Sequence, residues 1–414
     1  MHMRELPLLE SKKRLTQFSD MSLSAGLQQK LAAAHFTTPT PVQEMAIPHA
    51  LDGKDVLATA QTGTGKTLAF LLPIMEKLGA QPTATGVRAL ILVPTRELAM
   101  QVQAVYDKLR YGKLPKTALV IGGMAERPQI EAVRKGAGVI VATPGRLEDY
   151  LKRRLVDLSK VETLVLDESD RMLDMGFLPA LRRIVGSLPK QRQTLFFSAT
   201  LEASVAGLVS DYMRNPVRVA LGSISKPVES VELHAFEVPA ADKSDTLRRL
   251  LYDEQGQTLI FARTKRGTER LAKNLIRDGF SAAMIHGDRT QSQRVSALNG
   301  FCAGTFKVLV ATDVASRGIH VDNVAHVINY DLPDLAEDFI HRVGRTGRAG
   351  LKGRASTLVS GAEIGELRAI ERTLKLKIAR KRVDGSEIAA MKPRIVKNTL
   401  DSRTLAQLPG EVFC

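Results

Sequence analysis

Two short segments carry the residue types that nucleotide hydrolysis needs. The segment AQTGTGKT (60–67) follows an apolar run and has the Gly-Lys-Thr spacing of a phosphate-binding loop, with Ala60 in place of the first glycine. Its glycines let backbone N–H groups turn towards phosphates, and the next helix adds partial positive charge at its N-terminus. Lys66 is predicted to contact the β- and γ-phosphates, and Thr67 to bind Mg²⁺. The predicted nucleotide contacts in this loop are Ala60, Gln61, Thr62, Gly63, Thr64, Gly65, Lys66 and Thr67.

The second segment, LVLDESD (164–170), places carboxylates directly after another apolar run. Mg²⁺ beside a phosphate-binding loop needs such a carboxylate, and we assign Asp167 to the metal. Glu168 is the candidate general base that polarises the attacking water. Alone, the acids could be a solvated helix start and the glycines a simple turn. Together the two segments predict a nucleotide hydrolase.

Alternating elements must position these segments. Runs that are apolar on both faces, separated by helix-length stretches, are typical of parallel strands covered by helices on both sides. The predicted strands of the first half are 55–58, 89–93, 117–121, 138–142, 163–167 and 194–199. Those of the second half are 234–238, 258–262, 281–286, 307–312, 326–330 and 355–359. In such sheets ligands bind at the carboxyl ends of the strands, where both segments lie.

This pattern divides the chain into two α/β domains of similar size. We expect an N-terminal extension (1–17), a nucleotide-binding domain (18–220), a Gly/Ser/Pro-containing linker (221–229), a second domain (230–378) and a basic tail (379–414). The 414-residue length agrees with more than one domain.

Composition narrows the class of partner. With 59 Lys+Arg against 44 Asp+Glu the net charge is +15, which favours a polyanion such as nucleic acid or an anionic membrane surface, although a merely basic enzyme has the same charge. Aromatic residues make up 5% and Trp is absent, which argues against a face built mainly from base-stacking rings. Cys302 and Cys414 are too few for a disulfide framework. No signal peptide or membrane span is predicted, so we expect a cytosolic protein.

The chain resembles the DEAD-box RNA helicases from about Phe18 to residue 360. HFTTPTPVQ (35–43) is similar to that family's adenine-recognition segment, which implies that Gln43 reads the adenine edge and that Phe18 stacks on the base. SAT (198–200) matches the motif that links hydrolysis to strand separation, through Ser198 and Thr200. The resemblance implies two tandem RecA-like domains, each a parallel sheet covered by helices on both faces, that use ATP and Mg²⁺.

Further motifs fall in the family's order in both halves: PTRELA (94–99), a Gly-Gly pair, TPGRL (143–147), LIFART (259–264), HGD (286–288) followed by Gln291 and Arg294, TDVASRG (312–318) and HRVGRTGR (341–348). They imply backbone-directed contacts to RNA, which position a strand without reading its sequence. The implied RNA contacts are Pro94, Thr95, Arg96, Gly122, Gly123, Thr143, Pro144, Gly145, Arg146, Arg263, Gly287, Arg294 and Thr312. Asp313 and Gly318 are assigned to the nucleotide-facing edge of the second domain.

The implied mechanism depends on closure of the two domains. Arg345 and Arg348 lie too far along the chain to meet the phosphate loop locally, and after closure they would reach the γ-phosphate as arginine fingers, an effect worth about 10³–10⁵ in rate. RNA spanning both domains would favour closure, and the expected result is local unwinding. Two other hypotheses remain: an ATP-gated RNA clamp with little unwinding of its own, and a DNA helicase.

Three positions depart from the family pattern. Ser169 replaces the usual Ala of Asp-Glu-Ala-Asp and leaves the carboxylates intact, so activity should survive. His320 stands where the family usually has Asp, and it either alters ribose contact or closure or is an exposed loop residue without effect. His35 takes a place often given to Gly. The short flanks look most like bacterial RhlE-type members acting in ribosome assembly or RNA decay. We expect a monomer whose tail around Arg380, Lys381 and Arg382 either adds RNA affinity or is simply solvated.

Overall fold

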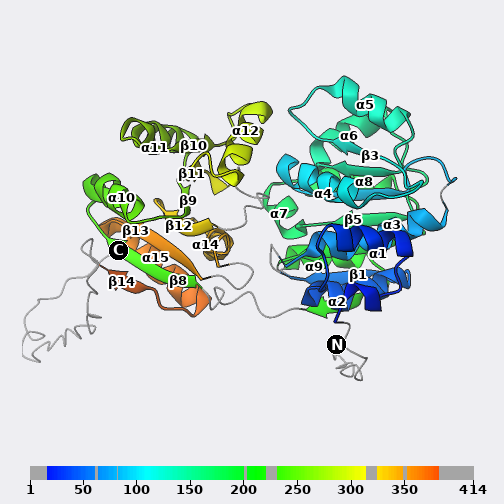
Figure 1. The fold of residues 1–414 in the computed structure, drawn as a ribbon, viewed down its shortest axis with the longest axis horizontal. Helices are drawn as coiled ribbons and strands as arrows, with labels where there is room; N and C mark the ends of the chain where they lie inside the picture. The colour runs from blue at the N-terminus through cyan, green and yellow to red at the C-terminus, as the bar shows by residue number, and fades with distance from the viewer. Residues whose placement is uncertain are drawn as a thin grey trace, which may run out of the picture.

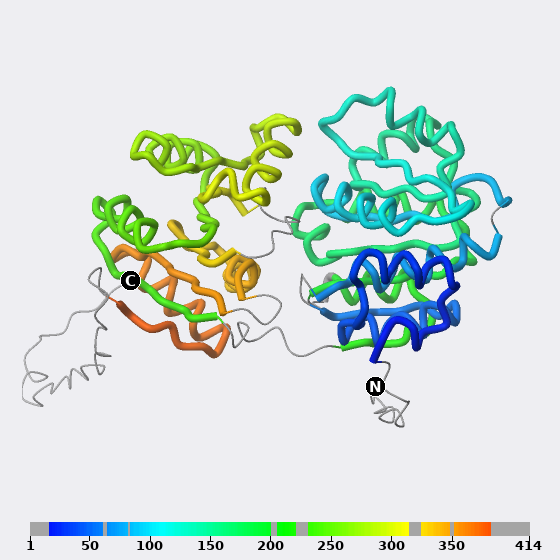
Figure 2. The backbone as a smooth tube through the Cα atoms, viewed as in Figure 1, coloured from blue at the N-terminus to red at the C-terminus, as the bar shows by residue number. Residues whose placement is uncertain are grey.

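Two parallel sheets, each with helices on both faces, lie side by side in the computed structural model (Figure 1). The structure describes residues 16–60, 64–81, 83–199, 203–220, 231–313, 324–347 and 352–381, and every structural statement below concerns these residues. The smooth backbone trace shows the first unit ending at one edge of its sheet before the second begins (Figure 2).

The first unit spans residues 16–220. Its strands are β1 (Val56–Thr59), β2 (Ala89–Leu92), β3 (Thr117–Val120), β4 (Val139–Ala142), β5 (Thr163–Leu166), β6 (Gln193–Ser198) and β7 (Val217–Ala220). Its helices are η1 (Phe18–Asp20), α1 (Ala25–Ala33), α2 (Pro41–Leu51), α3 (Lys66–Ala80), α4 (Arg96–Leu109), α5 (Glu126–Arg134), α6 (Pro144–Lys152), α7 (Ser169–Asp174), α8 (Leu178–Gly186) and α9 (Ala203–Tyr212).

The second unit spans residues 231–381. Its strands are β8 (Val231–Glu237), β9 (Gln257–Phe261), β10 (Ala282–Ile285), β11 (Val308–Ala311), β12 (Val324–Asn329), β13 (Gly353–Val359) and β14 (Ala379–Lys381). Its described helices are η2 (Ala240–Asp242), α10 (Lys243–Tyr252), α11 (Lys265–Arg277), α12 (Gln291–Cys302), α14 (Ala336–Val343), η3 (Gly361–Glu363) and α15 (Ile364–Leu374).

The two sheets have the same topology. The first has the order β3-β4-β2-β5-β6-β1-β7 and the second the order β10-β11-β9-β12-β13-β8-β14, which is the first order with every number raised by seven. All the strand pairs are parallel. Two tandem RecA-like domains are therefore present, as expected.

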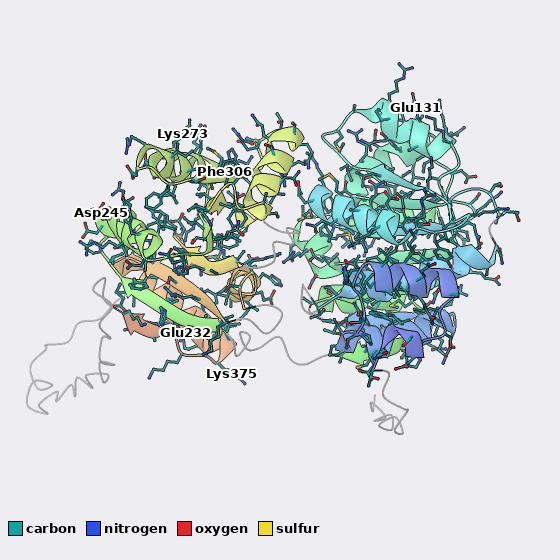
Figure 3. All side chains as sticks on the ribbon, viewed as in Figure 1. Glu131, Glu232, Asp245, Lys273, Phe306 and Lys375 are labelled. Carbon is teal, nitrogen blue, oxygen red and sulfur yellow. The ribbon has the colours of Figure 1, made fainter. Side chains whose placement is uncertain are left out.

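The cores explain why the strands are apolar on both faces. Successive side chains of a strand point to opposite faces. In β1, Val56 and Ala58 enter the core beneath α1–α4, while Leu57 enters the core beneath α6–α9. The second sheet is buried in the same way, with α12, α14 and α15 on one face and α10 and α11 on the other. Side chains fill the space between each sheet and its helices (Figure 3).

The predicted strands are confirmed, with ends that differ by a few residues, and two edge strands were missed. β7 precedes the expected linker, and β14 has the polar sequence ARK, which does not read as a strand. β14 pairs with β8, so the second sheet includes three residues that we placed in the tail. Residues 1–15, 221–230 and 382–414, which hold the extension, the linker and most of the tail, lie outside the described residues. None of the described helices is long and apolar enough to span a bilayer.

Candidate active site and nucleic-acid interface

Sheet order brings the phosphate loop and the acidic segment together. β6 pairs with β5 on one side and with β1 on the other, so Ala60, Asp167 and Ser198 lie at one edge of three neighbouring strands. These residues are more than 30 positions apart in every pairing, and only the sheet places them side by side.

The described part of the phosphate loop has the geometry of an anion cradle. Gly65 has φ 89 and precedes α3, and a Cβ there would lie 2.4 Å from Nε2 of Gln43, so glycine is required for both reasons. Lys66 is buried in the first turn of α3; its Nζ donates to the carbonyl of Ala60 (3.1 Å) and lies 3.9 Å from Oδ1 of Asp167. Thr67 lines a cavity next to Lys66 that is described below. Gln61, Thr62 and Gly63 lie outside the described residues.

Asp167 and Glu168 are buried, and Glu168 has a rare backbone conformation and a buried arginine partner. Glu168 has φ 51, a left-handed conformation that is rare for a residue with a side chain and is found often at functional sites. The guanidinium of Arg171, itself buried, donates to Oε2 of Glu168 at 2.8 Å. Burial raises the pKa of Asp167 to about 6, against the opposing charge of Lys66. We did not assign Arg171 from the sequence; its position three residues after Glu168, one helical turn on, was the available signal.

Ser169 fits its position without disturbing the acids. Its hydroxyl donates to the carbonyl of Leu166 (3.2 Å) and approaches that of Phe197 (3.4 Å). One residue on, Oδ2 of Asp170 accepts from the backbone of Ala199 at 2.9 Å, which ties the acidic segment to SAT. The hydroxyl of Ser198 is buried with no hydrogen-bond partner among the described residues, and Thr200 lies beyond them.

A cavity next to Lys66 has the features of a purine site. Phe18, which we predicted to stack on a base, lines it together with Phe36, an aromatic residue of HFTTPTPVQ that we did not assign. The Gln43 amide accepts from the backbone of Thr40 and donates to the carbonyl of Gly65, both at 2.8 Å. One N–H and one lone pair of that amide are left, which match the adjacent donor and acceptor of an adenine edge. His35, the residue before Phe36, has φ 63. This left-handed backbone conformation explains why the family often has glycine at this position.

The predicted RNA contacts of the first unit gather at the other half of the same edge, after β2, β3 and β4. The guanidinium of Arg96 lies over Gly122 and Gly123, so closely that a Cβ on Gly123 would be 2.0 Å from Nη1. Arg146 lies 3.4 Å from Glu126. The other predicted contacts sit at these strand ends or the starts of the following helices: Pro94, Thr95, Thr143, Pro144 and Gly145.

The second unit repeats this placement. Arg263, Gly287 and Thr312 follow β9, β10 and β11, which are the counterparts of β2, β3 and β4. Arg263 is exposed, and its guanidinium lies near Asp334 (3.9 Å) and Glu366 (3.8 Å).

A buried arginine that we did not single out, Arg342, holds Asp313 at the edge of the second unit that we predicted to face the nucleotide. Nε and Nη2 of Arg342 each donate to the carboxylate of Asp313 at 2.6 Å, and its guanidinium lies over Phe261. Asp313 is therefore engaged by protein in this conformation. Arg345 follows α14 and is buried. Gly318, His320 and Arg348 lie outside the described residues.

A buried contact between α4 and α12 joins the two units. Glu97 in α4 accepts a hydrogen bond from the amide of Gln291 (3.0 Å) and pairs with the guanidinium of Arg294 (2.9 Å), both in α12. All three side chains are buried. Arg294, predicted as an RNA contact, thus contacts the first unit in this conformation.

Comparison with known proteins accounts for this arrangement. The family model for the DEAD/DEAH box helicase matches residues 40–208, and that for the helicase conserved C-terminal domain matches residues 242–350. The DEAD-box ATP-dependent RNA helicase CshA of Bacillus subtilis is 42% identical over 364 residues, which cover 88% of this chain and 73% of the relative. The chain belongs to the DEAD-box RNA helicase family. The ATP-dependent RNA helicase CshA of Listeria monocytogenes is also 42% identical, over 87% of this chain and 69% of the relative.

Solved DEAD-box structures share the arrangement of both sheets. Saccharomyces cerevisiae Dbp5 bound to RNA and ADP BeF3 has a TM-score of 0.81 and 32% identity, covering 89% of this chain and 96% of that one. Mss116p bound to ssRNA and AMP-PNP has a TM-score of 0.82 and 29% identity, covering 91% and 81%. The expected enzyme class, an ATP-dependent RNA helicase, is confirmed by this membership.

Proposed function

We propose that this DEAD-box helicase hydrolyses ATP when RNA draws its two domains together, and that closure locally unwinds or remodels RNA. The observation that carries the proposal is the order of strands. The candidate nucleotide site lies at β5-β6-β1, while the predicted RNA contacts lie at β3-β4-β2 and, in the second unit, at β10-β11-β9. A strand that contacts both sets would bridge the domains.

The first unit supplies groups for ATP and Mg²⁺. Gln43 and the two rings Phe18 and Phe36 would hold the adenine, and Lys66 would neutralise phosphate charge. Mg²⁺ is usually held by one or two carboxylates together with phosphate oxygens, and Asp167 with the hydroxyl of Thr67 fits that pattern. The bound metal would stabilise charge on the phosphates. Glu168 then accepts the proton of the attacking water, and Arg171 keeps its carboxylate oriented.

The second unit would complete the site on closure. Arg345 and Arg348 are proposed to reach the γ-phosphate, and Asp313 and Gly318 to face the nucleotide from the second domain. Ser198 and Thr200 are proposed to transmit the change; the link between Asp170 and Ala199 supports this, because it connects the acidic segment to SAT. Support for closure also comes from the bond between Glu97 and Arg294, since it joins α4, which begins at Arg96, to α12.

Strand displacement and ATP hydrolysis measured on the same samples test the proposal. An RNA helicase should displace a short RNA strand and hydrolyse ATP faster with RNA than with DNA of the same sequence. RNA-stimulated hydrolysis without displacement would favour the clamp, and equal stimulation by DNA would favour a DNA helicase. A role with ribosome-assembly or RNA-decay proteins, a cytoplasmic location, a monomeric state and the RhlE-type assignment stay predictions.

A further inference from the structure

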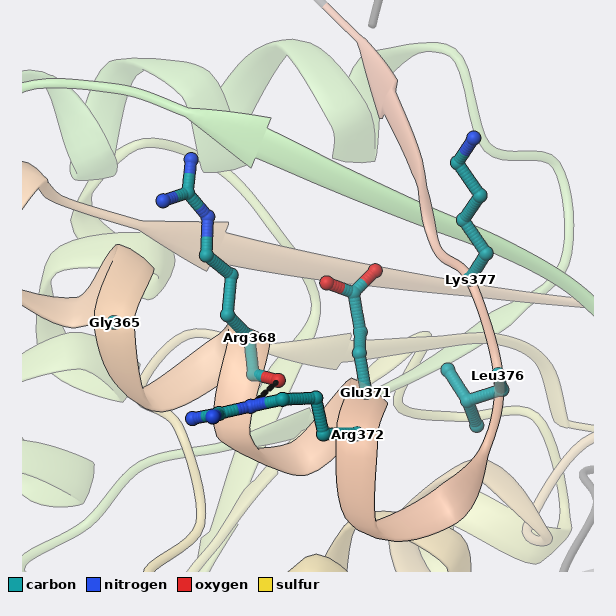
Figure 4. Close-up of a pocket in the computed structure, with 6 residues that line it drawn as sticks. All are labelled: Gly365, Arg368, Glu371, Arg372, Leu376 and Lys377. Carbon is teal, nitrogen blue, oxygen red and sulfur yellow. Dashed lines mark hydrogen bonds between the residues drawn. The ribbon is translucent and has the colours of Figure 1, made fainter. Parts of the chain in front are cut away.

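A basic groove lies on the second unit, and none of the predicted nucleotide or RNA contacts lines it. It runs between α15 and the segment that leads into β14. Figure 4 shows its lining: Gly365, Arg368, Glu371, Arg372, Leu376 and Lys377. We call these residues the α15 groove.

Among the described residues, no acidic side chain pairs with the cations of the α15 groove. Arg368, Arg372 and Lys377 are exposed, and no carboxylate of a described residue lies within ion-pair distance of any of them. Arg372 donates Nε to the carbonyl of Arg368 at 3.4 Å, which leaves most of its N–H groups free of protein partners.

The one acid in the groove is already neutralised. Both carboxylate oxygens of Glu371 accept from the guanidinium of Arg380, at 3.1 and 2.9 Å, and Oε1 also accepts from the backbone of Ile378 at 2.8 Å. Arg380 in turn approaches Glu237 at 3.2 Å. Glu371 therefore holds β14 in place and does not balance the charge of Arg368, Arg372 and Lys377.

The helix presents these charges at fixed positions. Leu367, Ile370 and Leu374 are buried against the sheet, so the opposite face of α15 must point outwards. Arg368 and Arg372 lie four residues apart on that face, about 6 Å along the helix axis. Like charges at this spacing destabilise a helix, so the arrangement has a cost that a bound anion would offset. Lys375 adds a further exposed charge at the helix end.

We propose that the α15 groove is a second RNA-binding surface. It holds the phosphate backbone of the part of an RNA that extends beyond the predicted contacts at the ends of the β-strands. The inference rests on the proposed function, because it assumes that RNA is the substrate. Guanidinium groups bind phosphate in a bidentate manner, and beyond the paired Arg380 the sequence continues with the basic residues Lys381 and Arg382. An acidic protein partner fits less well: Leu376 is the one apolar side chain lining the described groove, and no aromatic anchor lines it.

The test uses the full chain with R368Q, R372Q and K377Q combined. Two RNAs are compared: the shortest that gives full ATPase stimulation, and the same RNA with a single-stranded extension at either end. Wild type should bind one extended RNA more tightly than the short RNA. The triple variant should lose on the order of tenfold in affinity for that extended RNA. The slope of log affinity against log salt concentration should fall by about 2, because the loss of three phosphate contacts means that fewer counterions are released on binding. Its affinity for the short RNA and its maximal turnover should not change.

The matched control removes three cations from α11 of the same unit, R270Q, K273Q and R277Q. In Figure 3, Lys273 and Lys375 lie at opposite ends of this unit. The control should bind the extended RNA like wild type. If the control loses as much affinity as the groove variant, the effect comes from net charge alone and the proposal is overturned. Equal binding of both RNAs by wild type, or an unchanged triple variant, would also overturn it. Absence of any RNA stimulation in wild type would instead overturn the proposed function.

Discussion

At the scale of single residues, the site depends on buried charges with few partners. Asp167 has Lys66 at 3.9 Å and Glu168 has Arg171 at 2.8 Å, and all four side chains are buried. Such pairs are costly to break, because removal of one partner leaves the other charge unpaired in a poorly solvated place. Substitutions that keep shape are therefore the informative ones.

Glu168→Gln should separate binding from turnover. The amide keeps an acceptor for Arg171 but cannot take a proton, so ATP affinity should stay within a few-fold while RNA-stimulated turnover falls by about 10²–10⁴. Titration with a fluorescent ATP analogue and phosphate release measure the two quantities. Glu131→Gln, on the surface of α5, is the control and should leave both unchanged. Turnover close to that of wild type would show that Glu168 is not the base.

Lys66→Ala should act on binding itself. It removes the cation that is expected on the phosphates and leaves Asp167 without its neighbour, so ATP affinity should fall by at least about tenfold. The same titration measures this, with the exposed Lys54→Ala as control. If Lys66→Ala and Glu168→Gln bind ATP equally well, the two roles are assigned wrongly.

At the scale of elements, the two sheets share one strand order, and the second sheet also holds a buried group of titratable side chains. In the second sheet, β12 and β13 carry a buried polar cluster. Nε2 of His326 lies 2.8 Å from the hydroxyl of Ser356, and Nδ1 lies 3.4 Å from Oε2 of Glu254. Burial lowers the pKa of His326, and the contact with His326 lowers the pKa of Glu254 to about 2.

His326→Gln should flatten the pH dependence of stability between pH 7.5 and 5.5. In the unfolded chain histidine titrates near 6.5, whereas His326 in the folded chain takes up its proton at lower pH. The free energy of unfolding is therefore highest above the pKa of the unfolded chain and decreases as the pH falls below it. The decrease is about 1.4 kcal/mol per pH unit in the range where only the unfolded form is protonated. Glu254 stays ionised throughout this window. Urea unfolding by circular dichroism compares the slopes.

The control for this experiment is His234→Gln. His234 faces Ser356 across β8 and β13 but is only half-buried, so its removal should flatten the slope less. Parallel curves for wild type and His326→Gln would mean that the cluster does not titrate as its burial implies.

At the scale of the whole molecule, Glu97 couples the two units. It receives Gln291 and Arg294 from α12, and a buried pair of this kind holds only while the units stay together. The similarity to Dbp5, with a TM-score of 0.81 over 89% of this chain, extends over both sheets.

Arg294→Gln should lower RNA-stimulated turnover by about 10-fold or more, because it leaves the buried Glu97 carboxylate with the Gln291 amide but without its cation in the proposed closed form. ATP affinity without RNA should change little, since the nucleotide site lies at other strands. A double-mutant cycle with Glu97→Gln checks the contact: the double variant should lose no more than the single ones. Additive losses would show that the pair is not made during turnover.

The amino-acid sequence was enough to predict the chemistry of the site and the type of each main element. A strand that is buried on both faces is apolar at successive positions, so runs such as LVL (164–166) predict buried strands, and the residues that follow them mark the predicted site. Tertiary structure alone decided which strand ends are neighbours, and with them the pairs Asp313–Arg342 and Glu97–Arg294 and the lining of the α15 groove. The polar strand β14 was missed because its position is set by pairing with β8 and by the bond between Arg380 and Glu371. Local periodicity reports local burial, whereas contacts between distant residues follow from sheet order, which periodicity does not encode.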